Sequence, residues 1–149
     1  MKAFTFPLEK ALDWRRIQLE LEEVHYKQQV AAVSGLDRQR AEVEASGIRA
    51  EIQVREWRPI VGGDLSALGS FRLYVKSRES EIARLRFEAD KKLAEQRKLM
   101  LEARRRFTLL ERLKERRLTE WTATRNSEVE QIAAESYLAR WSRRRTSTL

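Results

Sequence analysis

The stretch Arg58-Pro59-Ile60-Val61-Gly62-Gly63-Asp64-Leu65-Ser66-Ala67-Leu68-Gly69 interrupts a chain that is otherwise charged and helix-forming throughout. Pro59 disfavours helical geometry at the residue before it, and the two adjacent glycines permit a turn. We therefore predict a single helical hairpin over residues 1–149, an all-α fold made of a long antiparallel two-helix coiled coil. The expected parts are helix one at about 6–57, a turn at about 58–70, helix two at about 71–141 and a basic tail at 142–149.

The composition favours long helices over a compact globule or a disordered chain. Of the 149 residues 36% are charged, which is too many for a thick core, yet 42% are hydrophobic and only 2 are proline. The chain has no cysteine, so disulfides and thiolate metal sites are excluded. We find no signal peptide at the N-terminus and no apolar run of membrane-spanning length, which makes a cytoplasmic location the expectation.

Capping residues suggest where the helices begin. Pro7 suits the first turn of a helix that starts near Phe6 with Thr5 as its N-cap. Asp64 or Ser70 can cap the second helix.

A heptad pattern of apolar residues predicts which faces of the two helices meet. Polar residues occupy the early d positions of helix one, which makes its seam imperfect. After Leu113 the register becomes uncertain. The predicted a and d positions of helix one are Leu12, Leu19, Tyr26, Val33, Arg40, Gly47 and Val54 (a) and Arg15, Glu22, Gln29, Leu36, Val43, Ala50 and Trp57 (d). Those of helix two are Val75, Arg78, Ile82, Leu85, Ala89, Lys92, Gln96, Leu99, Ala103, Arg106, Leu110 and Leu113.

Positive charge is concentrated in the last third of the chain. Residues 104–149 contain 12 Lys or Arg and 6 Asp or Glu, a net of +6 out of the +8 of the whole chain. Solvation of a helix face explains any single arginine, but the excess calls for solvent or an acidic partner. RNA, DNA, an anionic membrane and an acidic protein would all satisfy it. Trp121 and Trp141 lie in the same region, and because tryptophan and arginine are common in binding hot spots, this end is the strongest candidate interface.

Catalytic motifs are missing from the sequence. His25 has no second histidine or cysteine with which to share a metal, and Gly62-Gly63-Asp64 lacks the residues of a nucleotide-triphosphate loop. We therefore expect no enzymatic activity, no cofactor and no metal.

Aromatic residues surround the predicted turn. Trp57, Phe71 and Tyr74 lie there with several aliphatic residues, more than two helix ends easily cover. Two interpretations stand equally: a small local core, or a hairpin tip that binds another protein.

Two stretches of the chain resemble the flagellar export protein FliJ family. The opening Phe4-Thr5-Phe6-Pro7-Leu8-Glu9-Lys10-Ala11-Leu12-Asp13-Trp14-Arg15 is similar to the family's Phe-x-Phe start with an arginine a few residues later. Leu109-Leu110-Glu111-Arg112-Leu113-Lys114-Glu115-Arg116-Arg117-Leu118-Thr119-Glu120-Trp121 is similar to its Leu-Glu-x-Leu-Lys-Glu-Arg stretch. The segment Glu128-Val129-Glu130-Gln131-Ile132-Ala133-Ala134-Glu135 falls where the family carries an acidic, glutamine-containing segment. It departs from the family at Ile132-Ala133-Ala134, where the family often has Leu-Asp-Glu.

The resemblance implies a function in flagellar type III protein export. Such a protein is an antiparallel coiled coil, similar to the γ subunit of rotary ATPases, whose paired termini enter the ring of a hexameric export ATPase and activate it. It also contacts the export-gate membrane protein and export chaperones, which implies a place at the cytoplasmic face of the inner membrane. The implied ATPase-binding residues are Trp14, Arg15, Arg16, Arg104, Arg105, Arg106, Arg112, Arg116, Arg117 and Trp121, and the implied gate-binding residues are Phe71, Tyr74 and Val75.

Two other classes of protein remain as alternatives. A basic coiled coil that clamps nucleic acid would bind duplexes or RNA with a steep salt dependence. Nucleic acid is the less favoured partner because Glu111, Glu115 and Glu120 interrupt the basic clusters. A self-associating scaffold would instead form a stable homodimer.

Overall fold

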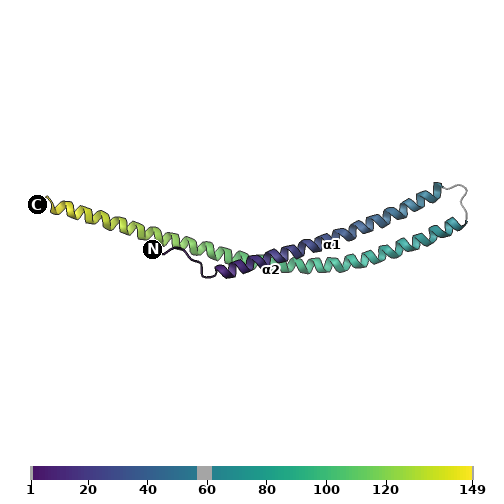
Figure 1. The fold of residues 1–149 in the computed structure, drawn as a ribbon, viewed down its shortest axis with the longest axis horizontal. Helices are drawn as coiled ribbons and strands as arrows, with labels where there is room; N and C mark the ends of the chain where they lie inside the picture. The colour runs from purple at the N-terminus through teal and green to yellow at the C-terminus, as the bar shows by residue number, and fades with distance from the viewer. Residues whose placement is uncertain (1, 57–61, 149) are drawn as a thin grey trace. The chain divides into compact units, whose positions relative to one another are not determined.

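The computed structural model describes residues 2–56 and 62–148 and contains two long helices packed against each other in antiparallel directions (Figure 1). Helix α1 runs over Glu9–Glu56 and helix α2 over Gly62–Thr146. The described residues include no strand, so the predicted all-α hairpin is confirmed. No stretch of the described helices is both long and apolar enough to cross a membrane.

Helix α2 begins at Gly62, well before the predicted start near Phe71. Asp64 lies in its first turn, where a carboxylate is favourable against the helix dipole, while Ser70 is inside the helix and is not a cap. The prediction overestimated how strongly the glycines disfavour a helix here, because each glycine costs only about 1 kcal/mol in a helix. The rest of the predicted turn, together with the end of helix one at Trp57, lies outside the described residues.

The other two helix ends also differ from the prediction. Helix α1 begins at Glu9, whose N–H donates to the Phe6 carbonyl at 3.1 Å, so Phe6 and Thr5 precede the helix. Phe6 is buried, which holds this non-helical segment in place. At the other end α2 continues to Thr146 through most of the predicted basic tail. Arginines are favourable in a last turn, and the Thr148 hydroxyl donates to the Arg144 carbonyl at 2.9 Å.

The described residues group into two compact units, one formed by Gln18–Ala103 and the other by Met1–Ile17 with Arg104–Leu149. We call them the hairpin unit and the terminal unit and describe each by itself. The single domain over residues 1–149 stays a prediction.

The hairpin unit has a thin core of aliphatic side chains. Val33 and Val54 of α1 and Ile82 and Met100 of α2 are buried, and Ile82 is only 1% exposed. Val33, Val54 and Ile82 lie at predicted a or d positions, so the predicted seam is confirmed at these residues. Among the predicted positions of α1 in this unit, Arg40 is the exception, because it is exposed and pairs with Glu44 of its own helix at 3.3 Å.

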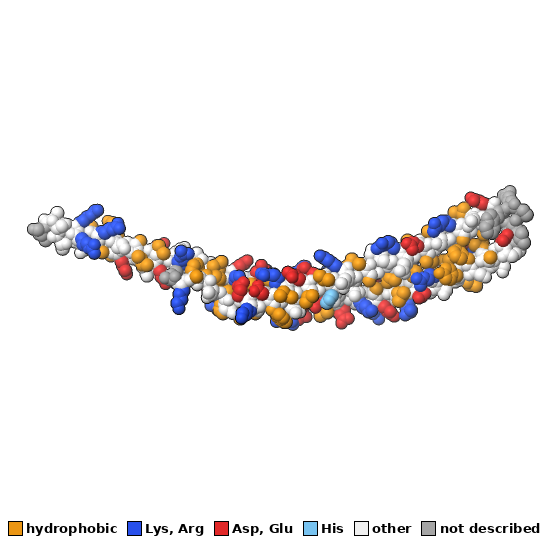
Figure 2. Space-filling view, viewed as in Figure 1, with side chains coloured by type: hydrophobic (Ala, Val, Ile, Leu, Met, Phe, Trp, Pro, Cys, Tyr) orange, Lys and Arg blue, Asp and Glu red, His pale blue; other side chains and the backbone are white. Residues whose placement is uncertain are grey.

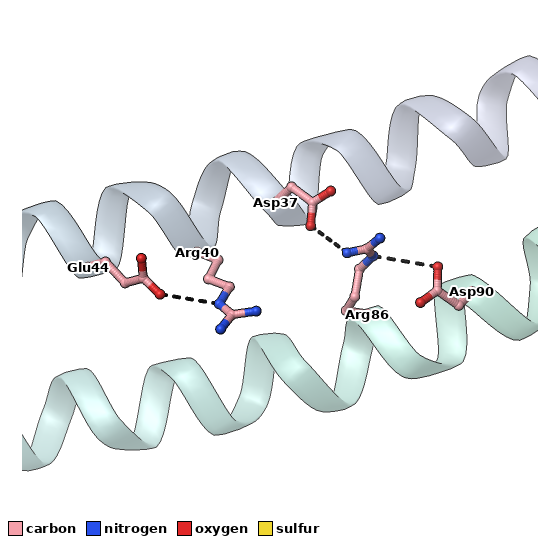
Figure 3. Close-up of polar contacts among 5 residues, drawn as sticks. All are labelled: Asp37, Arg40, Glu44, Arg86 and Asp90. Carbon is pink, nitrogen blue, oxygen red and sulfur yellow. Dashed lines mark hydrogen bonds and ion pairs between the residues drawn. The ribbon is translucent and has the colours of Figure 1, made fainter.

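Polar contacts fix the register of the two helices in the hairpin unit. Arg86 of α2 pairs with Asp37 of α1 at 2.5 Å and lies 3.5 Å from Asp90 of its own helix (Figure 3). Arg72 pairs with Glu51 across the helices at 2.9 Å. In both interhelical pairs the two residue numbers add to 123, so the register is the same at both positions.

The seam of α2 departs from the predicted heptads after Ala89. Lys92, Leu99 and Arg106 are exposed, and their neighbours Leu93, Met100 and Phe107 are packed instead. The packed residues therefore step by four twice in succession, through Leu85, Ala89 and Leu93, before three-and-four spacing resumes. Such a stutter locally unwinds a coiled coil and keeps two cations out of the seam. The predicted a and d positions at 92, 99 and 106 are wrong by one residue.

The terminal unit is formed by the chain's first residues packed against α2. Phe6 and Leu12 are buried, and Leu12 is 1% exposed. Lys114 of α2 donates to the Glu9 carboxylate at 2.9 Å, which ties the start of α1 to α2. Beyond Trp121 every described residue is exposed, and α2 continues to Thr146. Among these described residues, Arg125 shares a groove with Phe4 of the N-terminal segment.

Candidate partner-binding sites

Three of the predicted arginines lie on one face of α2 in the terminal unit. Arg105, Arg112 and Arg116 are spaced with Leu109 at i, i+4, i+7 and i+11, which places all four on one side of a helix. All four are exposed, and Leu109 is 56% exposed. We call these four residues the arginine face. It combines fork-shaped cations with one apolar side chain, which suits binding to carboxylates or phosphates on a surface.

The charges of the arginine face are only partly neutralised. Arg116 lies 3.4 Å from the Glu120 carboxylate, an exposed pair that water screens. Within residues 2–56 and 62–148, Arg105 and Arg112 have no ion pair. These two guanidinium groups are therefore available to an acidic partner.

The remaining predicted arginines of α2 lie on other sides of the helix. Arg104 and Arg106 flank Arg105 at about 100° on either side, and both interact with other residues. Arg117 lies 3.9 Å from Glu120, beside the packed face. The structure therefore divides the six predicted arginines between the arginine face and its flanks.

Trp14, Arg15 and Arg16 of α1 point in three different directions, because consecutive helical residues are about 100° apart. The Arg16 guanidinium lies 5.6 Å from the centre of the Phe107 ring, a cation–π contact between the helices. Arg15 stacks on Trp14 at 4.6 Å, and Trp14 is 52% exposed. Arg16 therefore contributes to packing, while Trp14 is exposed and carries the half-buried Arg15 on its ring.

Trp121 is covered on two sides. Its ring lies 5.9 Å from the Phe4 ring in a tilted arrangement, and the Arg125 guanidinium lies 5.4 Å from it. Phe4, Arg117 and Trp121 also line a groove of about 530 Å³ between the non-helical N-terminal segment and α2. Sequence analysis missed Arg125, although its spacing of four from Trp121 is the signal of a helical neighbour.

The predicted tip residues lie in α2, nine to thirteen residues after its start at Gly62. The Phe71 and Tyr74 rings are 6.1 Å apart, and Tyr74 is 60% exposed. Val75 is half-buried and lies opposite Gly47, where the two helices approach closely enough that an added Cβ would be 3.5 Å from a Val75 methyl group. Tyr74 is thus the most accessible of the three, whereas Val75 belongs mainly to the seam.

Phe71 and Val75 form a wall shared by two grooves of the hairpin unit. One groove, of about 580 Å³, also includes Ile48 and Leu73, and the other, of about 350 Å³, includes Tyr74. Hydrophobic side chains gather over these ends of α1 and α2 (Figure 2). Leu73 is 70% exposed, so the described residues leave much apolar surface open here.

No metal centre is found in the described part of the chain. No group of three metal-ligating side chains occurs there. The His25 ring lies 4.0 Å from the Glu22 carboxylate and is 55% exposed, with no further ligand beside it. No family model, curated protein or solved structure matches the chain.

Proposed function

We propose that the chain is a non-enzymatic component of the flagellar type III export apparatus, a coiled-coil stalk that binds and activates the hexameric export ATPase. In this role it acts at the cytoplasmic face of the inner membrane and links the ATPase to the export gate and to export chaperones. It is held there by its protein partners and has no catalytic residues of its own.

The observation that carries the proposal is the contact between the two stretches that resemble the FliJ family. They lie more than a hundred positions apart in the sequence, yet Phe4 packs on Trp121 and Glu9 pairs with Lys114. A shared surface built from both stretches is what a protein that inserts its paired termini into a ring requires.

The arginine face supplies the chemistry for the proposed ATPase contact. Arg105 and Arg112 have no ion pair among the described residues, and Leu109 between them is exposed. Acidic side chains on the inner surface of a ring would pair with the arginines while the leucine is removed from water. The exposed Trp14, with the half-buried Arg15 stacked on it, adds a second contact from α1.

The hairpin unit supplies the proposed contact with the export gate. Phe71 and Tyr74 stand between two grooves beside the exposed Leu73. An apolar segment of the gate protein would bury these side chains. Replacing Tyr74 by Ala should therefore weaken binding to the gate protein and leave ATPase stimulation intact.

The proposal is tested by measuring ATP hydrolysis by the export ATPase of the same organism, at physiological salt, with and without the purified chain. We expect stimulation by the wild-type chain and none by the triple variant Arg105→Glu, Arg112→Glu and Arg116→Glu. The helical content of the variant, measured by circular dichroism, should be unchanged because all three side chains are exposed.

A matched control separates the arginine face from the overall charge. The variant Arg38→Glu, Arg49→Glu and Arg97→Glu changes three exposed arginines of the hairpin unit and alters the net charge equally. It should stimulate the ATPase as the wild type does. Failure of the wild-type chain to bind the ATPase, together with salt-sensitive binding to duplex DNA or RNA, would replace the proposal by the nucleic-acid clamp.

A further inference from the structure

The C-terminal end of α2 carries an apolar face that nothing else in the described structure covers. At about 100° per residue, Ala133, Ala134, Tyr137, Leu138 and Trp141 fall within an arc of about 140° of the helix surface. Tyr137 is 69%, Leu138 59% and Trp141 51% exposed. We call residues 133–146 the amphipathic end.

Arginines border this apolar face and follow it. Arg140 lies beside the face, and Arg143, Arg144 and Arg145 occupy the last turn of α2. The Arg145 guanidinium lies 4.8 Å from the centre of the Trp141 ring. Glu135 is the one acidic residue in the amphipathic end, so four cations face a single anion.

We propose that the amphipathic end binds directly to the surface of a bilayer that contains anionic phospholipids. The helix would lie in the interface, with Leu138 and the rings of Tyr137 and Trp141 between the headgroups and the acyl chains. The arginines would extend their guanidinium groups to the lipid phosphates. This inference does not depend on the proposed role with the ATPase.

Several features of the segment favour a membrane over other occupants. Tryptophan and tyrosine are the residues that prefer the interface of a bilayer, because an apolar ring and a polar N–H or O–H are both satisfied there. Arginine has a long apolar stem and a charged head, so it can reach headgroups from a helix buried at this depth. Short basic helices with one aromatic and apolar face are typical of interfacial anchors.

Charge disfavours the two main alternatives. Two copies of the amphipathic end would bring eight arginines together against two glutamates, and this repulsion opposes a dimer through the apolar face. A nucleic-acid duplex would pair with the arginines but would leave Tyr137, Leu138 and Trp141 in water. An anionic bilayer satisfies the charges and the apolar face together.

The test is co-sedimentation of the full chain with lipid vesicles at physiological ionic strength. We expect binding to phosphatidylcholine vesicles that contain about one-third phosphatidylglycerol and little binding to pure phosphatidylcholine. Each arginine near an anionic surface changes the partition coefficient roughly fivefold, so the variant Arg143→Gln, Arg144→Gln and Arg145→Gln should bind roughly a hundredfold more weakly. Trp141→Ala should lower the partition coefficient about tenfold by removing apolar area.

A control variant distinguishes the segment from net charge alone. Arg38→Gln, Arg49→Gln and Arg97→Gln remove the same charge from the hairpin unit and should leave vesicle binding within about twofold of wild type. The proposal is wrong if this control loses as much vesicle binding as the Arg143→Gln, Arg144→Gln and Arg145→Gln variant, or if the wild type does not bind the anionic vesicles. It is also wrong if sedimentation shows a homodimer that Trp141→Ala dissociates. Because the readout is vesicle binding, failure here leaves the ATPase proposal untouched.

Discussion

Replacing Ile82 by Ala should destabilise the hairpin unit far more than the same kind of truncation at an exposed position. Ile82 is 1% exposed, so truncation to Ala removes three buried carbons at about 0.8 kcal/mol each, or about 2.4 kcal/mol. Leu73 is 70% exposed and loses an equal number of carbons, so its truncation should cost about 0.7 kcal/mol. The cost at Ile82 should stay near the lower end of the range for buried side chains, because the interface of two helices is thin enough to collapse around the gap.

Urea unfolding followed by circular dichroism at the helical minimum measures both free energies of unfolding. The slope of the free energy against urea should be the same in Ile82→Ala, Leu73→Ala and the wild type, since the surface exposed on unfolding hardly changes. Equal destabilisation by the two variants would refute the reasoning, because burial would then not decide the cost. A loss below about 1 kcal/mol at Ile82 would mean that this residue is not in a packed core.

Two further predictions concern backbone freedom and the cover of a tryptophan. Gly35→Ala and Gly47→Ala should each raise the free energy of unfolding by about 0.5–1 kcal/mol, because both glycines are helical and a new Cβ at Gly47 meets the Val75 methyl group at an ordinary 3.5 Å. Urea unfolding measures both changes. A loss of stability in Gly47→Ala would show that the helices are closer than described. Phe4→Ala should expose the Trp121 ring and cost about 1 kcal/mol from the aromatic pair. A red shift of tryptophan emission reports the exposure, and unchanged emission would mean that Phe4 does not cover the ring.

The hairpin could be predicted from the sequence because its signals are local. A proline and a pair of glycines lie between two long stretches of helix-forming residues, and periodic apolar residues such as Val33 and Ile82 mark the faces that meet. The start of α2 was harder to predict, because the glycines near it are helical at a cost that neighbouring good helix formers offset.

Which residues of α2 pack against α1 depends on desolvation energies, which a strict heptad repeat does not take into account. Lys92 and Arg106 fit the repeat by count, but burying either cation without a partner costs more than shifting the packed face by one residue. The apolar neighbours Leu93 and Phe107 made the shift possible. The heptad prediction was therefore wrong where a cation and an apolar neighbour compete for the packed position, because the cost of desolvating the cation decides between them.

The sequence predicts which stretches of the chain hold the candidate sites more readily than which side chains share one face of a helix. The sequence identified the arginine-rich stretch, but only helical geometry separates Arg105 and Arg112 from the flanking Arg106. The contact between Phe4 and Trp121 joins distant parts of the chain, so no local pattern reveals it. The amphipathic end was recognised from the sequence as basic and aromatic, and the unequal lengths of the two predicted helices already left it without a partner helix. The structure confirms that its residues are exposed.

The constant register of the interhelical pairs restricts how the length of such a chain can change. Arg72 with Glu51 and Arg86 with Asp37 share one alignment within the hairpin unit, so a single inserted residue between Arg72 and Arg86 would displace one pair relative to the other. Insertions or deletions there are tolerated when they occur in both helices and preserve the packed faces, which favours paired changes of whole repeats. Residues 126–132 have no such counterpart among the described residues, so that stretch can lengthen or shorten one residue at a time without displacing an interhelical pair.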